Sequence, residues 1–99
     1  MKIIDATEAV LELSPVLDLV AASALQEAFT QHRGHSIRLD ASGVQRLGGQ
    51  CLQVLLAARA AWAVDGKNFL IEHESEEFST SLELLGMPIA DLTYAKDAT

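Results

Sequence analysis

The stretch RLDASGVQRLGGQCLQVLLAARAAW, residues 38–62, decides the fold class of this chain. It leads from an apolar strand pattern, through a loop that contains Gly48 and Gly49, into a long run with helical spacing. In that run Leu52, Leu55 and Trp62 mark one broad apolar face. The stretch therefore predicts a strand that is followed, after a glycine-containing loop, by a helix packed on a core.

Strand and helix patterns alternate on both sides of this stretch. We predict strands over residues 8–13, 36–40 and 68–72, helices over residues 16–32, 51–64 and 75–86, and a short edge strand over residues 89–94. Such alternation is typical of an α/β fold with a mixed or parallel sheet and right-handed crossovers. Because 99 residues suit one small domain, we expect a single domain over residues 1–99.

Two polar residues mark predicted helix starts. Asp18 and Ser75 are residue types that cap a helix by accepting a hydrogen bond from a first-turn N–H group. The apolar stripe predicted for the first helix is Leu17, Val20, Ala24, Leu25, Ala28 and Phe29, and that for the third helix is Phe78, Leu82 and Leu85.

Composition and charge exclude several classes of protein. Hydrophobic residues make up 49% of the chain, which is enough for a packed core. The formal charge of −7, with only 7 Lys and Arg residues, argues against binding to nucleic acid or to an anionic membrane surface. The longest mostly apolar run, residues 52–64, is too short to span a bilayer, and residues 1–5 do not resemble a signal peptide. We expect a cytoplasmic protein without membrane insertion.

Few residues offer catalytic or metal-binding chemistry. Cys51 lies at a predicted helix start, where a thiol can be activated, but no positioned base accompanies it. We interpret it as a buried packing residue. His32, His35 and His73 have no further Cys or His pair to complete a metal site. Because no convergent polar pocket is indicated either, we expect neither an enzyme nor a cofactor or metal site.

Three segments in order carry a resemblance to a known family. They are LSPVLD at residues 13–18, IRLD at residues 37–40 followed by LGGQCL at residues 47–52, and residues 78–86 with their L-x-x-x-G ending. In this order and spacing the chain resembles the STAS domain of sulfate transporters and anti-sigma factor antagonists, and most of all small stand-alone STAS proteins associated with bacterial chemotaxis. The resemblance implies a small mixed β-sheet with about three helices packed largely on one face.

The resemblance also implies a phosphorylation position, and this chain departs from it. In the family's switch members a partner kinase phosphorylates a Ser or Thr in a D-S-S/T-G-L element at the start of the second helix. When Leu52 is aligned with the leucine of that element, Cys51 takes the glycine, Gln50 the hydroxyl residue and Gly48 the aspartate. An amide cannot accept a phosphoryl group, so we expect no switch at Gln50. Ser42 lies too early for the element and is interpreted as a turn former, with phosphorylation of Ser42 as the alternative.

What remains is a contact surface at the start of the second helix. We expect it to comprise Asp18, Gly48, Gly49, Gln50 and Gln53. For Asp18 a pure capping role, and for the glycine pair a tight turn, are the alternatives. The resemblance implies a non-enzymatic protein-interaction module in bacterial signalling, with a chemotaxis component or an anti-sigma-factor-like kinase as partner. Two alternatives stay open: a STAS subunit that binds the ATPase of a lipid ABC transporter, and a STAS domain that binds a small ligand.

Overall fold

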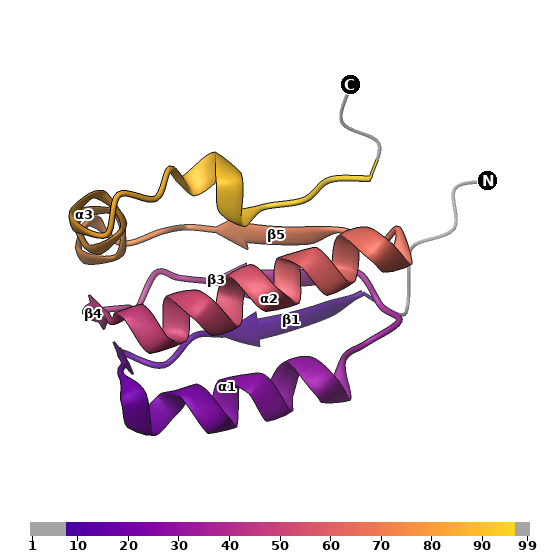
Figure 1. The fold of residues 1–99 in the computed structure, drawn as a ribbon, viewed down its shortest axis with the longest axis horizontal. Helices are drawn as coiled ribbons and strands as arrows, with labels where there is room; N and C mark the ends of the chain where they lie inside the picture. Colours follow the sequence, from indigo (N-terminus) through magenta and orange to yellow (C-terminus); the bar gives the residue numbers. More distant parts are fainter. Residues whose placement is uncertain (1–7, 97–99) are drawn as a thin grey trace.

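Strands and helices alternate along the chain as the sequence predicts (Figure 1). The structure is a computed structural model, and it describes residues 8–96. The elements in that range are β1 (Ala9–Glu12), β2 (Val16–Leu17), α1 (Leu19–Gln31), β3 (Ile37–Asp40), β4 (Arg46–Leu47), α2 (Gly49–Asp65), β5 (Phe69–Glu72), α3 (Glu76–Leu84) and the 3₁₀ helix η1 (Ile89–Leu92).

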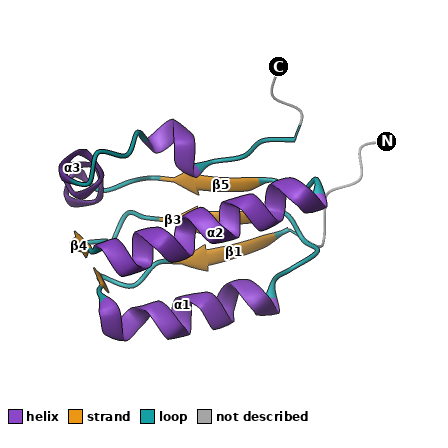
Figure 2. Ribbon diagram, in the orientation of Figure 1, coloured by secondary structure: helices purple, strands orange, loops and turns teal. Residues whose placement is uncertain are grey.

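The main sheet has the strand order β1-β3-β5, and all three strands run parallel. Successive side chains of a strand point to opposite faces, so one face carries Ile37 and Leu39, which are fully buried, and the other carries the exposed Arg38. An antiparallel bridge between Phe69 and Tyr94 gives the sheet its mixed character. α1 and α2 lie side by side over the buried face (Figure 2). The predicted α/β fold with helices largely on one face is confirmed.

An aromatic cluster joins the two covering helices to the sheet. Phe29 of α1, Trp62 of α2 and Phe69 of β5 have ring centroids 5.6 to 5.9 Å apart. All three side chains are buried. The indole Nε1–H of Trp62 also donates a hydrogen bond of 2.7 Å to the carbonyl oxygen of His35. The cluster therefore fixes α2 both by packing and by one directed polar contact.

The starts of two helices differ from the predicted boundaries. α1 begins at Leu19 rather than at residue 16, because Val16–Leu17 pair in parallel with Arg46–Leu47 as a second, two-stranded sheet. The predicted loop over residues 41–50 therefore contains a short strand, and α2 begins at Gly49. α1 therefore starts just after β2, and α2 starts just after β4. Because β2 and β4 are hydrogen-bonded to each other, the two helix starts lie close together.

Four further expectations are wrong. Ala24, predicted for the apolar stripe of the first helix, is exposed, because it directly precedes the buried Leu25 and so points to another side of α1. Val20 is 86% exposed, because the buried face of α1 follows Leu25 and Phe29 at i and i+4, and Val20 lies off that line. Leu85 is 42% exposed, because α3 ends at Leu84 and Leu85 is already its C-cap, so the helical spacing from Phe78 and Leu82 does not continue to it. Residues 89–94 form the helix η1 rather than an edge strand, and from this segment Tyr94 alone pairs with β5 among the described residues.

Candidate functional site

The start of α2 lies against the link between β2 and α1. The backbone N–H of Gly48 donates to the carbonyl oxygen of Leu17 at 2.8 Å, and the Sγ atom of Cys51 donates to the carbonyl oxygen of Asp18 at 3.2 Å. The Oδ1 atom of Asp18 accepts a hydrogen bond of 3.2 Å from the N–H of Ala21, so Asp18 is the N-cap of α1. The structure thus brings together Asp18 and the glycine pair, although 30 residues separate Asp18 from Gly48 in sequence.

The two glycines are not required by the backbone conformation. Gly48 has φ −99° and ψ 169°, an extended geometry that any residue adopts, and Gly49 is the first residue of α2. A Cβ atom on Gly49 would meet no atom within 4 Å, and one on Gly48 would make an ordinary contact of 3.5 Å with the carbonyl oxygen of Leu17. A tight turn therefore does not explain the pair. Its effect is to keep this surface free of side chains.

The first turn of α2 differs from those of the other two α-helices in residues 8–96. Asp18 caps α1 through its carboxylate, and Ser75 caps α3 by accepting a hydrogen bond of 3.0 Å from the N–H of Phe78. Gly48 is the N-cap of α2 and supplies no side-chain acceptor, and the first turn of α2 carries no acidic residue. The N–H groups at this helix start are therefore left to water or to an acceptor on another molecule.

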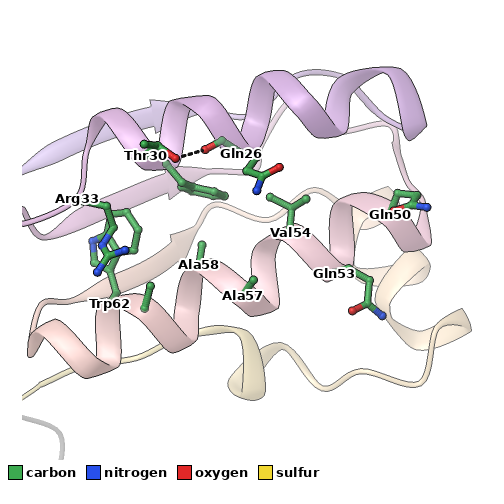
Figure 3. A pocket seen from close by; sticks show the side chains of 11 residues that line it. Gln26, Thr30, Arg33, Gln50, Gln53, Val54, Ala57, Ala58 and Trp62 are labelled. Carbon is green, nitrogen blue, oxygen red and sulfur yellow. Dashed lines mark hydrogen bonds between the residues drawn. The ribbon is translucent and has the colours of Figure 1, made fainter.

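Gln50 and Gln53 extend the same surface along α2. Both are exposed, and they lie about one helical turn apart beside a groove between α1 and α2 (Figure 3). The groove has a volume of about 480 Å³. Its other lining residues are Gln26, Phe29, Thr30, Arg33, Val54, Ala57, Ala58, Ala61 and Trp62.

At the end of the groove away from Gln50, Arg33 forms an ion pair (Figure 3). The Nε and Nη2 atoms of Arg33 donate to the two carboxylate oxygens of Asp65 at 2.9 and 3.1 Å. This hydrogen-bonded partner lowers the pKa of Asp65 and raises that of Arg33. The guanidinium also lies 5.8 Å from the ring centre of Trp62. Because its charge is already matched, Arg33 offers no free cation to an occupant of the groove.

Comparison with known protein families identifies the family of the chain. A family model described as "Mlab, STAS domain" matches residues 3–92. The chain belongs to the STAS domain family. No curated protein and no solved structure matches the chain at the threshold applied. Membership of the family makes this STAS domain a protein-interaction or regulatory module.

The STAS domain places Gln50, which was aligned with the family's hydroxyl residue, and Ser42, the alternative phosphorylation position, on different elements. Gln50 is the second residue of α2 and is exposed there. Ser42 lies in the turn after β3, where its N–H donates to the Oδ1 atom of Asp40 at 2.9 Å. That backbone hydrogen bond and the Ser42 hydroxyl lower the pKa of Asp40, with a smaller contribution from His73. The predicted turn therefore forms, but the side chain that accepts its backbone hydrogen bond is that of Asp40.

Two apolar side chains beside the surface were not expected there. Leu19 and Val20, directly after the Asp18 cap, are 69% and 86% exposed. The helical pattern had assigned Val20 to the core. The predicted cap at Asp18 could have shown this, because an N-cap at residue 18 makes Leu19 the first helical residue and so determines which face of α1 is buried. The STAS domain consequently presents apolar groups next to its side-chain-free helix start.

Cys51 has a structural role in this STAS domain. It is fully buried at the start of α2, as expected for a packing residue. Burial, and then the charge of Asp18, raise the pKa of its thiol, so little of the nucleophilic thiolate forms near neutral pH.

Residues 8–96 contain neither a metal-binding cluster nor a membrane-spanning helix. No cluster of three or more His, Cys, Asp or Glu side chains is placed to hold a metal ion in that range. No helix in the same range is long and apolar enough to cross a membrane.

Proposed function

We propose that this STAS domain is a non-enzymatic module of bacterial signalling that binds its partner through the start of α2. The partner class is a chemotaxis component or an anti-sigma-factor-like kinase. The observation that carries the proposal is the uncapped start of α2 at Gly48, where backbone N–H groups are not covered by side chains. Asp18, Gly49, Gln50 and Gln53 surround or extend this point.

The exposed groups indicate how the contact is made. The amides of Gln50 and Gln53 each donate and accept hydrogen bonds, and the N–H groups of the first turn of α2 donate hydrogen bonds to a partner carbonyl or carboxylate. Leu19 and Val20 add apolar area at the edge. Because Gln50 carries no hydroxyl group, the contact is constitutive and is not released by phosphorylation at this position.

A pair of glycine substitutions tests the surface. Gly49→Glu places a charged side chain at the helix start, and Gly43→Glu makes the same change in the exposed turn after β3; both sites have open space around the new Cβ. We expect Gly49→Glu to lose capture of a chemotaxis protein or kinase in a quantitative pull-down, and Gly43→Glu to retain it. Loss with Gly43→Glu alone would move the surface to the Ser42 turn and contradict the proposal.

The absence of a switch is tested separately. The wild-type chain is incubated with ATP and the captured kinase, and its intact mass is measured. We expect no phosphorylated product from the wild type. The variant Gln50→Ser supplies a hydroxyl group at an exposed helix start, so we expect it to gain one phosphoryl group. Stoichiometric phosphate on Ser42 of the wild type would show that the alignment of Gln50 with the family's hydroxyl residue is wrong.

A second candidate keeps the surface and changes the partner to the ATPase of a lipid ABC transporter. It is retained because the matching family model is described as "Mlab, STAS domain" rather than by a signalling role. In the same pull-down, enrichment of a transporter ATPase that is lost with Gly49→Glu favours this candidate over the signalling partner.

A further inference from the structure

The main sheet leaves one of its two faces uncovered in the part of the chain that the structure describes. α1 and α2 both lie over the other face, where Ile37 and Leu39 are fully buried (Figure 2). On the uncovered face Val10 is 70% exposed, and the side chain of Arg38 is 45% exposed. Parallel strands usually occur in sheets that have both faces covered. We refer to this face as the open face; it is formed by Val10, Glu12, Arg38, Asp40, Leu70 and Glu72.

Three carboxylates form a row across the open face. Glu12, Asp40 and Glu72 are register partners on β1, β3 and β5, and neighbouring strands lie about 4.8 Å apart. Like charges at facing positions of neighbouring strands repel one another. Arg38 offsets part of this repulsion, because it donates to Glu72 at 3.5 Å and to Glu8 at 3.0 Å. One guanidinium among four carboxylates leaves an excess of negative charge on this face.

The remaining cations of residues 8–96 belong to other parts of the fold. Two lie on the helices of the covered face, one in the second sheet and two near the amino-terminal end of β5: Arg33, Arg59, Arg46, Lys67 and Lys96. Directly after β5, His73 and Glu74 follow the row, so the neighbouring carboxylate adds to its charge. The three carboxylates of the row are not placed to share one metal ion. The row therefore matches cations that are carried on separate side chains.

An apolar residue lies beside the row on each outer strand. Val10 precedes Glu12 by two residues and Leu70 precedes Glu72 by two, so each pair points to the same face. The open face thus offers apolar contact and negative charge side by side. Helices pack on the covered face of this sheet, and a helix is also the element that commonly covers a second face. A helix with an apolar stripe bordered by Lys or Arg matches both features.

We propose that the open face binds a cationic amphipathic helix of another protein. Apolar side chains of this helix contact Val10 and Leu70, and its Lys or Arg side chains pair with Glu12 and Glu72. The site lies across the main sheet from α2, so it leaves the partner surface at the start of α2 accessible (Figure 2). The proposal therefore does not rest on the proposed function.

Titration of a labelled peptide tests the charge of the site. The probe is a fluorescent peptide of Leu and Lys at the spacing of an amphipathic helix, and its anisotropy is measured as the chain is added. We expect saturable binding with a dissociation constant below about 100 μM. The double variant Glu12→Gln/Glu72→Gln should weaken binding at least about fivefold. The control Glu27→Gln/Glu83→Gln, which removes the same charge from exposed positions of α1 and α3, should stay within about twofold of wild type. Absence of saturable binding, or equal losses in the two double variants, overturns the proposal.

A second pair of variants tests the apolar part of the site. Val10→Ser removes apolar area from the open face and should weaken peptide binding about threefold. Val64→Ser makes the same change at the end of α2, where Val64 is 85% exposed, and should have no effect. A peptide with Glu in place of Lys should not bind. Equal losses for the two serine variants, or binding of the Glu peptide with the affinity of the Lys peptide, contradict the proposed site. Gly49→Glu should bind the Lys peptide as wild type does, because the partner surface lies elsewhere.

Discussion

The Sγ atom of Cys51 donates a hydrogen bond of 3.2 Å to the carbonyl oxygen of Asp18, and this contact connects the first turn of α2 to the cap of α1. The same Asp18 accepts a hydrogen bond from Ala21 through its carboxylate. One residue therefore fixes the start of its own helix through its side chain and contacts the neighbouring helix through its backbone. The position of the candidate surface depends on both interactions.

Substitution of Asp18 separates its capping role from this contact. Asp18→Ala removes the acceptor for the N–H of Ala21 but keeps the backbone carbonyl that contacts Cys51. We expect the free energy of unfolding in urea to fall by about 1 kcal/mol. Asp18→Asn retains a capping oxygen and should remain within a few tenths of a kcal/mol of wild type. If both variants were as stable as wild type, the cap would contribute nothing to stability.

The turn after β3 should give the protein a component of acid sensitivity. The hydrogen bonds from Ser42 hold the pKa of Asp40 below its ordinary value in the folded state. Ionised Asp40 therefore stabilises the fold above the unfolded pKa of about 4, and this contribution is lost as the pH falls through the lowered folded pKa. Asp40→Asn keeps an acceptor oxygen but cannot titrate.

The measurement is the free energy of unfolding of wild type and Asp40→Asn at several pH values from about 7 to about 3. We expect the stability difference between the two proteins to shrink toward the acid end. Other carboxylates, such as the paired Asp65, titrate in both proteins and cancel in the comparison. A difference that is constant with pH would mean that Asp40 has the same pKa in the folded and unfolded states.

Trp62 should be a main determinant of stability. Trp62→Phe keeps an aromatic ring among Phe29 and Phe69 but removes the Nε1–H group that donates to His35. We expect a loss of about 1–3 kcal/mol from the unpaired carbonyl, with a further loss from the smaller ring. Because the chain has one Trp, unfolding is followed by far-ultraviolet circular dichroism.

Arg33→Met provides the comparison for that variant. It removes the exposed ion pair with Asp65 and the contact with the Trp62 ring but leaves the aromatic cluster in place. Exposed ion pairs contribute little, so we expect a loss below about 1 kcal/mol. A larger loss for Arg33→Met than for Trp62→Phe would show that the contacts of Arg33, rather than the aromatic cluster, hold the two helices together.

The strands and helices with a clear period were predictable, and the short ones were not. Residues 37–40 alternate apolar and polar residues, and residues 69–72 begin with a short apolar run just after the turn at residues 65–67, so both strands were predicted to within one residue. A two-residue strand such as Val16–Leu17 has no period at all, and it forms because Arg46–Leu47 lies beside it in the folded chain. The four residues of η1 are likewise too short to show a period, so the local sequence did not distinguish this helix from an edge strand.

The candidate site was predicted as a set of residues but not as a physical surface. The grouping of Asp18 with the start of α2 followed from the family resemblance, and the structure brings these residues into contact. The missing side-chain cap on α2 and the exposure of Leu19 depend on where each helix begins.

The bridge between Tyr94 and Phe69 has a consequence for the behaviour of the protein at high concentration. Two hydrogen bonds, of 2.7 and 2.8 Å, join the backbones of these residues at the outer side of β5. A free strand border is a template on which foreign chains add and fibres grow. Here an incoming chain must first displace Tyr94, so this border resists amyloid-like polymerisation for as long as the segment after η1 stays in place.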